Sequence, residues 1–355
     1  MQYHFRYCLL LVFILLGIYR SKAQLCADSL CGTAACICSA DRSPAGIMIS
    51  HVHEKKQWML SYRYMNMYMN ELQSGTTSIA RSKVYQYYQA APIDMQMNMH
   101  MLMGMYGFND KFSLMGMLNY TVWDMNMDMA SATSSVHNHS DTGPHKMHSS
   151  GIGDAGIQAL YEAITYNNHH LILNGGLNLP LGNTEVKGAV KDLMYSNTVY
   201  PYAMQQGSGT TDMQAGVNYL WQKGRGSFGS QFNALIRTGK NNAGYSPGNE
   251  LNLNNWLAWQ WLKPLSSSVR INLLHSEKIK GSNPSLPLYD EPSGNPSNYG
   301  GNKIMCYAGL VFQSKNKALN HYRLAVEYGL PAYENLNGIQ LKTQQALSCS
   351  CSVLF

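Results

Sequence analysis

The chain has little charge and, beyond its first residues, no long apolar run. Only 13% of its 355 residues are Asp, Glu, Lys or Arg, about half the share usual in soluble domains. The net charge is +6, and it falls to +3 without the three basic residues at positions 6, 20 and 22, which is too little to indicate nucleic-acid binding. No later stretch approaches the roughly 18 apolar residues that a transmembrane helix needs. The sequence therefore indicates either an exported soluble protein or a membrane protein that spans with strands.

The first 23 residues are typical of a secretory signal peptide. Arg6 is followed by an apolar run from Leu9 to Ile18, and Ser21-Lys22-Ala23 forms a small-x-small cleavage site. We therefore expect an exported chain that begins at Gln24.

Cysteine is scarce along most of the chain but clusters just after this signal. The cluster consists of Cys26, Cys31, Cys36 and Cys38. In an oxidising compartment such a cluster forms disulfides, and under reducing conditions its thiolates suit a soft metal. The sequence leaves both interpretations open.

What the chain has in abundance is methionine at every second position. It occupies each odd position from Met95 to Met105, then Met115, Met117, Met125, Met127 and Met129. A period of two places side chains on one face of a β-strand, whereas a helix would scatter them. Residues 107–111, of sequence Gly-Phe-Asn-Asp-Lys, have turn chemistry. We therefore predict a long β-hairpin with methionine along one side.

The neighbouring rows indicate which side that is. Even positions from Phe112 to Val122 form an apolar row about as long as the 9–11 residues with which a strand crosses a bilayer. An earlier stretch, 57–70, carries Arg63 among its odd-numbered methionines, and a mid-span arginine belongs in a lumen. The methionines are therefore predicted to face inward. For the strand of Met95–Met105 the alternative stays open that Gln96, Asn98 and His100 face the lumen instead.

About twelve strands alternate strictly between long polar loops and short turns after residue 56. This asymmetry is typical of outer-membrane barrels, in which long loops are extracellular and short turns periplasmic. The last strand alternates and ends on Phe355, which resembles the signal that the outer-membrane barrel-assembly machinery recognises. We predict an all-β, closed antiparallel transmembrane β-barrel at residues 57–355. Residues 24–56 are then a Cys/His-containing periplasmic leader that could plug the barrel, and residues 1–23 the signal peptide.

Several short segments resemble a known family. They are His51-Val52-His53 with residues 58–64 (WMLSYRY), Met99-His100-Met101, Gly151-Ile152-Gly153-Asp154, residues 179–182 (LPLG), 206–210 (QGSGT) and 244–248 (GYSPG). In order and spacing they resemble the outer-membrane transporter family named after the "MetA-pathway of phenol degradation", which is related in architecture to the long-chain fatty-acid channel. The resemblance implies a twelve-stranded barrel and passage of small molecules. The Cys-rich leader departs from that family, so a phenolic substrate does not follow.

Two sets of candidate functional residues emerge. The residues expected to line the lumen are Arg63, Met65, Met67, Met99, His100, Met101, Met115, Met117 and Asp154. Thioether, imidazole and thiolate ligands suit Cu(I), so the candidate metal ligands are His51, His53, Met125, Met127, Met129, His137, His139, His145, His148, Cys26, Cys31, Cys36 and Cys38. Methionine that merely fills the interior is the simpler alternative.

The sequence thus predicts a passive outer-membrane channel of a Gram-negative bacterium. The alternatives are a Cu(I)/Ag(I)-binding or Cu(I)/Ag(I)-transporting barrel with a methionine wall, and a sealed structural barrel. We expect no enzyme, because His275 and Ser276 are neighbours on a strand and point to opposite faces. No cofactor is required, although copper(I) is possible. The expected partners are outer-membrane lipid and lipopolysaccharide, the barrel-assembly machinery, and a small-molecule or metal solute, with no nucleic acid.

Overall fold

The computed structural model describes residues 42–130, 145–188, 198–286, 290–313 and 322–355. Eleven antiparallel elements form one sheet. They are β1 (Trp58–Gly75), β3 (Ala90–Asn109), β4 (Phe112–Met129), β5 (His145–Tyr166), β6 (His169–Leu179), β9 (Asp212–Lys223), β10 (Gly226–Arg237), β12 (Glu250–Leu262), β13 (Leu265–Ser276), β15 (Gly301–Gln313) and β16 (Tyr322–Leu354). The short β2 (Thr77–Ile79) pairs with the end of β1.

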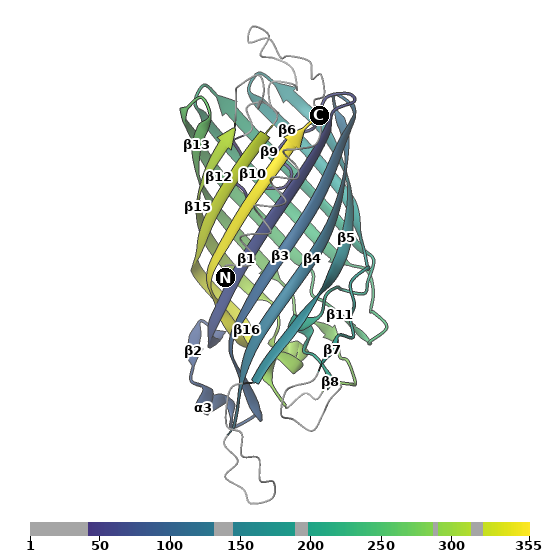
Figure 1. Cartoon of the computed structure of the whole chain (residues 1–355), viewed down its shortest axis with the longest axis vertical. Coiled ribbons are helices and arrows are strands. Elements are labelled where there is room, and N and C mark those ends of the chain that lie inside the picture. Colours follow the sequence, from purple (N-terminus) through teal and green to yellow (C-terminus); the bar gives the residue numbers. More distant parts are fainter. Residues whose placement is uncertain (1–41, 131–144, 189–197, 287–289, 314–321) are drawn as a thin grey trace, which may run out of the picture.

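The sheet closes because β16 pairs with both β15 and β1 (Figure 1). Residues 323–336 of β16 run antiparallel to β15, and residues 336–354 run antiparallel to β1. A barrel whose neighbours are all antiparallel needs an even number of strands. β16 therefore reverses, and Gly338, with a φ of 62°, supplies the tight turn. Counted this way, twelve strands form the wall, as the sequence predicts.

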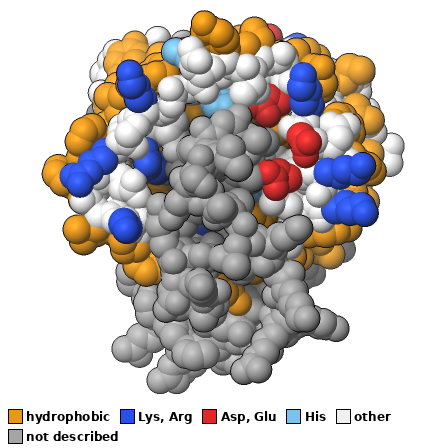
Figure 2. Space-filling model, turned by 90° about the horizontal axis from the view of Figure 1, so that it is seen from above, with side chains coloured by type: hydrophobic (Ala, Val, Ile, Leu, Met, Phe, Trp, Pro, Cys, Tyr) orange, Lys and Arg blue, Asp and Glu red, His pale blue; other side chains and the backbone are white. Residues whose placement is uncertain are grey.

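Short turns lie at one end of the barrel and long connections at the other. The turns at Asp110-Lys111, Asn167-Asn168, Gly224-Arg225 and Lys263-Pro264 lie at the end that holds the C-terminus, which is the upper end in Figure 1. Seen from that end, charged side chains lie across the surface and hydrophobic ones around its rim (Figure 2). The predicted alternation of short and long connections is confirmed from β1 to β15, whereas the reversal within β16 is a tight turn at the long-connection end.

The long connections carry small elements of their own. These are α3 (Arg81–Val84), β7 (Lys187–Gly188), β8 (Thr198–Val199), η1 (Tyr202–Met204), β11 (Tyr245–Ser246), β14 (Lys280–Gly281), η2 (Pro292–Gly294) and η3 (Pro296–Asn298). Within the described ranges, the helices are all too short and too polar to cross a membrane.

Side chains alternate between the two faces of the wall, except at β-bulges such as the one between Leu118 and Tyr120 in the β4–β5 pair. On β13, Val269 is 56% exposed whereas the adjacent Ser268 is 5% exposed. On β3, Leu102 is 50% exposed between the buried Met101 and Met103. Apolar side chains thus cover the outside, as expected for a surface that meets lipid. The fold is a closed antiparallel transmembrane barrel.

Four adjacent strands are much longer than β6, β9, β10, β12, β13 and β15, which have 11 to 13 residues. β1, β3, β4 and β5 have 18, 20, 18 and 22 residues, whereas a bilayer needs 9–11. Outside the apolar band their outward residues are polar: Asn126 donates a hydrogen bond to Asp94, and Asp124 pairs with Lys146. The wall therefore rises beyond the membrane at the long-loop end. β5 begins at His145 and pairs with β4 as far as Met127, so both strands extend into this part of the wall.

Candidate functional site: a lumen with two different walls

Methionines from neighbouring strands meet in rows along one wall of the lumen. The register places Met65 opposite Met99 on β1 and β3. On β3 and β4 it places Met103 opposite Met117, and other pairs of the same kind are Met67–Met97, Met69–Met95, Met105–Met115 and Met95–Met125. All these residues have inward parity and are buried or half-buried. We call this surface the methionine wall.

The opposite side of the lumen is built from amides. Inward positions of β6, β9, β10, β12 and β13 carry Asn174, Asn178, Gln214, Asn218, Gln231, Asn233, Asn252, Asn254 and Asn272. These side chains bond to one another across strands: Asn218 donates to Asn174 at 3.1 Å, and Asn272 donates to Asn254 at 3.0 Å. We call this surface the amide wall. The lumen is therefore apolar and polarizable on one side and rich in donors and acceptors on the other.

Residues 42–56, which we call the plug segment, lie inside the short-turn half of the barrel. At its start the Arg42 guanidinium bonds to Gln260 at 2.9 Å, near the β12–β13 turn. In its middle Gln231 donates to the Ile49 carbonyl at 3.0 Å. At its end the His53 N–H donates to the Ser113 hydroxyl at 2.9 Å, beside the β3–β4 turn. The segment therefore enters the lumen, turns and returns to the same rim before β1 begins.

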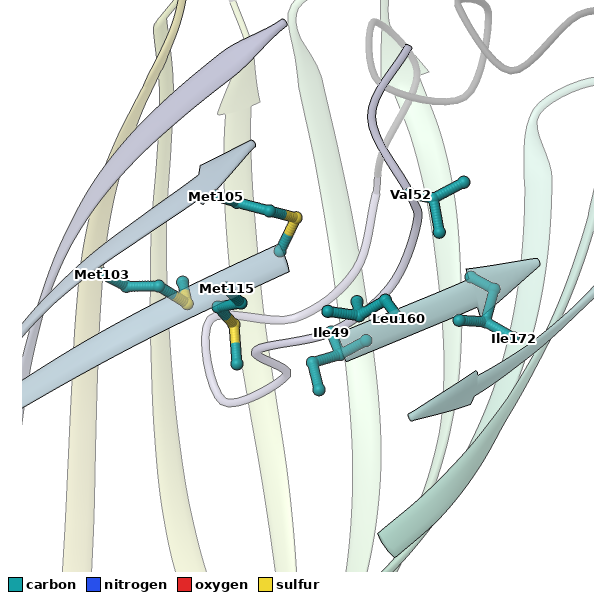
Figure 3. Packing of buried hydrophobic residues seen from close by; sticks show 7 residues of the cluster. All are labelled: Ile49, Val52, Met103, Met105, Met115, Leu160 and Ile172. Carbon is teal, nitrogen blue, oxygen red and sulfur yellow. The ribbon is translucent and has the colours of Figure 1, made fainter. Parts of the chain in front are cut away.

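An apolar cluster fixes the second half of the plug segment. Ile49 and Val52 pack with Met103, Met105, Met115, Leu160 and Ile172, all at most 6% exposed (Figure 3). Figure 3 shows the loop of the plug segment passing between the methionines and the two aliphatic residues of β5 and β6. Burial of apolar area stabilises such packing by about 25 cal/mol per Å². Part of the methionine wall thus serves as the seat of the plug segment.

An ionic cluster fixes the first half. Arg270 bonds to both carboxylate oxygens of Glu327, at 2.9 and 2.8 Å, and lies over the ring of Tyr307. The same carboxylate accepts a hydrogen bond from the Gly46 N–H at 2.9 Å. Arg63 donates to the Ile47 carbonyl at 2.9 Å. Glu327, which is itself held by Arg270, and Arg63 thus bind the backbone of the plug segment.

A small cavity remains between the plug segment and the methionine wall. Its lining is Met48, Ser61, Arg63, Met101, Met103 and Met117, and its volume is ≈ 10 Å³, enough for about one water molecule. Little free space is therefore left between the plug segment and the methionine wall around this cavity.

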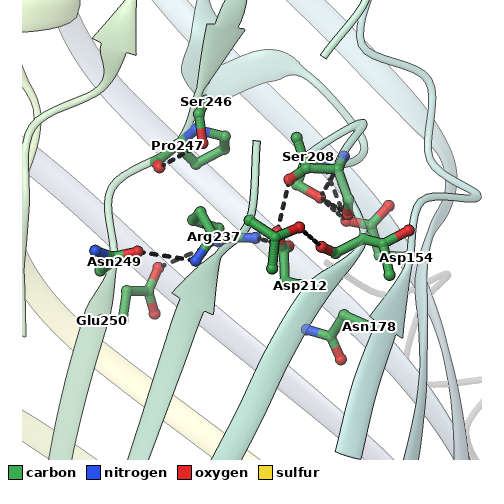
Figure 4. Close-up of polar contacts among 12 residues, drawn as sticks. Asp154, Asn178, Ser208, Asp212, Arg237, Ser246, Pro247, Asn249 and Glu250 are labelled. Atoms are coloured by element: carbon green, nitrogen blue, oxygen red, sulfur yellow. Dashed lines mark hydrogen bonds and ion pairs between the residues drawn. The ribbon is translucent and has the colours of Figure 1, made fainter. Parts of the chain in front are cut away.

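At the long-loop end, residues 198–211 fold back into the mouth. Asp154 of β5 accepts hydrogen bonds from the Gly182 N–H at 3.1 Å, and from both the N–H and the hydroxyl of Ser208, at 2.8 and 2.7 Å (Figure 4). Asp212 pairs with Arg237 and accepts from the Thr210 hydroxyl at 2.6 Å. These buried carboxylates tie the segment to the wall.

Residues 283–286 and 290–299 lie beside this segment. The Asn283 N–H donates to the Tyr202 hydroxyl at 2.9 Å, and the Ala203 N–H donates to the Tyr299 hydroxyl at 3.1 Å. Burial raises the pKa of Glu291 to about 7, and it raises the pKa of Tyr245, which packs on Tyr202, to about 12. Glu291 and Tyr245 are therefore neutral near pH 6.

Most of the predicted lumen residues face inward. Arg63, Met65, Met67, Met99, Met101, Met115, Met117 and Asp154 share the inward parity. His100 does not: it lies on the outer face, where it bonds to the Tyr62 hydroxyl at 2.7 Å and contacts the rings of Tyr64 and Tyr120. The alternative that Gln96, Asn98 and His100 line the lumen is therefore wrong, because the methionines of β3 take that face.

The predicted metal ligands are separated. His51 and His53 lie in the plug segment with ring centroids 4.9 Å apart. Met125, Met127 and His145 face inward at the opposite end of the barrel, with Met129 half-buried beside them, whereas His148 is exposed on the outer face and bonds to Asp124 at 3.0 Å. His137, His139, Cys26, Cys31, Cys36 and Cys38 lie outside the described residues. Within the described ranges, His, Cys, Asp and Glu side chains form no group of three or more that could hold a metal ion.

Several residues of this site could not be anticipated. Met48 and Met204 reach the lumen from irregular segments without periodicity, and Glu327 and Arg270 lie far from the plug segment along the chain. The only sequence signal for these contacts was that Gln231 lies in the inward-facing row of β10.

Comparison with known proteins agrees with this geometry. No protein-family model matches the chain, and its sequence matches none of the curated proteins. Among solved structures, an outer-membrane channel from Pseudomonas putida F1 is similar over 86% of this chain and 97% of its own, with a TM-score of 0.56 and 10% identity. Weaker similarity links the chain to a Pseudomonas aeruginosa FadL homologue (TM-score 0.42, 9% identity, 84% and 90% covered) and to the NanC porin (TM-score 0.42, 8% identity, 83% and 98% covered). At these identities the likeness concerns the fold, and the chain shares its fold with an outer-membrane channel.

Proposed function

We propose that the protein is a passive channel for small molecules in the outer membrane of a Gram-negative bacterium. The observation that carries this proposal is a closed barrel with an apolar outer band and a lumen lined by amides and thioethers. A barrel that served only as an anchor would not need hydrogen-bonding groups along its interior. The fold shared with an outer-membrane channel supports the same conclusion.

The two walls indicate the class of solute. Amides replace the hydrogen bonds that a solute loses when it leaves water, and thioethers make favourable contacts with apolar and aromatic surfaces. We infer that the channel favours small amphipathic molecules, which present a polar edge to the amide wall and an apolar face to the methionine wall.

We infer that passage requires the plug segment to move, because the cavity between it and the methionine wall holds about one water. The segment is attached by the hydrogen bonds of residues 42, 43, 46, 47, 49 and 53 and by the packing of Ile49 and Val52. It contributes no strand to the wall. Its displacement therefore leaves the barrel closed and intact.

Transport rather than catalysis is the expected activity. The buried His170 bonds to Glu162 at 2.7 Å, and the Thr165 hydroxyl donates to the same carboxylate oxygen at 2.7 Å. In a catalytic triad the hydroxyl nucleophile gives its proton to the imidazole and not to the carboxylate. This cluster therefore has the components of a catalytic triad in an order that does not activate the hydroxyl.

Liposome swelling tests the proposal. The refolded full-length chain is compared with a variant in which residues 42–50 are replaced by a Gly/Ser sequence of equal length, and the solutes are uncharged and of graded size. We expect slow swelling with the smallest solutes for the natural sequence and faster swelling, with a larger size limit, for the variant. Size-matched hydrophilic and amphipathic solutes then test the preference.

The rival is a sealed structural barrel. If neither protein lets any solute pass, although both are folded and inserted, the channel proposal is wrong and the sealed barrel takes its place.

A further inference from the structure

Four methionines stand in one row at the long-loop end of the methionine wall. The register places Met69 of β1 opposite Met95 of β3, Met95 opposite Met125 of β4, and Met125 opposite Met147 of β5. Met95, Met125 and Met147 are at most 4% exposed. Cα atoms of residues directly opposite in an antiparallel pair lie about 4.5–5.5 Å apart, and each methionine side chain has three rotatable bonds. Neighbouring sulfur atoms of the row are therefore within joint reach.

A fifth methionine caps the row from the mouth segment. Met204, the last residue of η1, is fully buried and packs in the same cluster. The Ser149 hydroxyl donates to the Met204 carbonyl at 2.7 Å and so fixes the residue beside β5. We call these five residues the thioether cluster.

We propose that the thioether cluster binds a single Cu(I) or Ag(I) ion. Thioethers are neutral soft donors that select such ions, and hard ions such as Ca²⁺ and Mg²⁺ require oxygen ligands. The inference goes beyond the proposed channel function and does not depend on it. His145 lies opposite Met127 in the next inward position of the same strands, and imidazole is a further ligand type that suits copper.

Whether a methionine can bind the ion depends on its position along the wall as well as on its sulfur atom. At the short-turn end, Met103 and Met117 line the small cavity together with Arg63, whose guanidinium repels a cation. Met105 and Met115 there pack against aliphatic residues of the plug cluster. The thioether cluster lies beyond these contacts, among apolar and aromatic neighbours. In this part of the wall a soft cation can therefore contact several sulfur atoms without contacting the buried arginines of the ionic cluster.

The alternative is that these methionines only pack the mouth segment against the wall. Leucine fills nearly the same volume, and such exchanges are usually tolerated in cores, but leucine offers no donor atom. Exchange of Met for Leu therefore separates packing from ligation.

Binding is measured on the refolded full-length chain in detergent, with its thiols reduced and then blocked by N-ethylmaleimide so that cysteine does not compete. Cu(I) is kept reduced by ascorbate, and its affinity is measured by competition with bicinchoninate. The test variant is M95L/M125L/M147L. The matched control is M103L/M105L/M115L. It makes the same exchange at three positions of β3 and β4 that lie outside the thioether cluster.

We expect the natural sequence and the control to retain one tightly held ion and the test variant to lose it. X-ray absorption at the copper edge should show sulfur ligands in the first two proteins. Methionine-methyl NMR supplies a second measurement: added Ag(I) should shift the resonances of the thioether cluster first. Weak binding that is equal in all three proteins, or equal loss in both variants, would overturn the proposal and leave apolar packing as the role of the cluster.

Discussion

The plug segment is held by a buried carboxylate, so a neutral substitute should loosen it. In Glu327→Gln the Gly46 N–H keeps an acceptor but loses a charged one. Hydrogen bonds to charged groups are roughly twice as strong as neutral ones, so we expect the plug segment to lose about 1.5 kcal/mol of attachment. That loss corresponds to roughly a tenfold larger population of the displaced state.

The barrel itself also loses stability in this variant. Arg270 is 6% exposed and is bonded to both carboxylate oxygens of Glu327. Breaking a buried ion pair from one side costs about 3–5 kcal/mol. A control must therefore separate the loss of plug attachment from the loss of barrel stability.

Glu334→Gln is that control. Glu334 is also buried and pairs with Lys303 at 3.2 Å, and it accepts from the Thr343 N–H at 3.0 Å, but none of these partners belongs to the plug segment. Planar-bilayer recordings should show roughly tenfold more frequent openings for Glu327→Gln than for the natural sequence, and no change for Glu334→Gln. Equal recordings for all three proteins, each shown to be folded, would refute the view that the carboxylate holds the plug segment.

Three further outcomes follow from other parts of the molecule. Burial raises the pKa of Glu291 to about 7 from its ordinary value of 4.5. The packing of residues 290–299 should therefore be most stable below about pH 4.5 and weaken as the pH rises through 7. Amide exchange of this segment between pH 4 and 8 measures the change, and Glu291→Gln should abolish the pH dependence. Ile271→Arg places a charge in the outer apolar band and should destabilise the inserted barrel by about 2–4 kcal/mol. His275→Arg, farther along the same outward row, should cost about 0–1 kcal/mol. Unfolding in lipid by urea compares the stabilities of the two variants. Gly107→Ala pushes a Cβ into the backbone carbonyl at the end of the plug segment and should raise proteolysis there, and an unchanged cleavage rate would contradict the close approach.

The outer and inner faces of the wall could be predicted well because side chains along a barrel strand point alternately to one face and the other. The row Phe112, Leu114, Leu118 and Tyr120 identified the outer face of β4, and the structure places it there. The same alternation was ambiguous on β3, since one row is methionine from Met95 to Met105 and the other mixes Gln96, Asn98 and His100 with Leu102 and Tyr106. Pairing with β1 and β4 settles that case: Met99 lies opposite Met65 on the inside.

The contents of the lumen could not be predicted in the same way. Residues 42–56 have no periodicity, and their contacts with residues such as Glu327 cross most of the chain. The aromatic pocket around His100 likewise depends on which strand lies beside it. Contacts of this kind are fixed by the closure of the sheet and leave no mark on any single stretch of sequence.

The attachment of the plug segment has a consequence for the order of biogenesis. The segment leaves the ribosome before any strand, yet Glu327, which binds its backbone, and Arg270, which holds Glu327, belong to the last third of the chain. These contacts can therefore form only after the last strands have been made. The earliest part of the described chain thus depends on the latest strands for its place in the lumen.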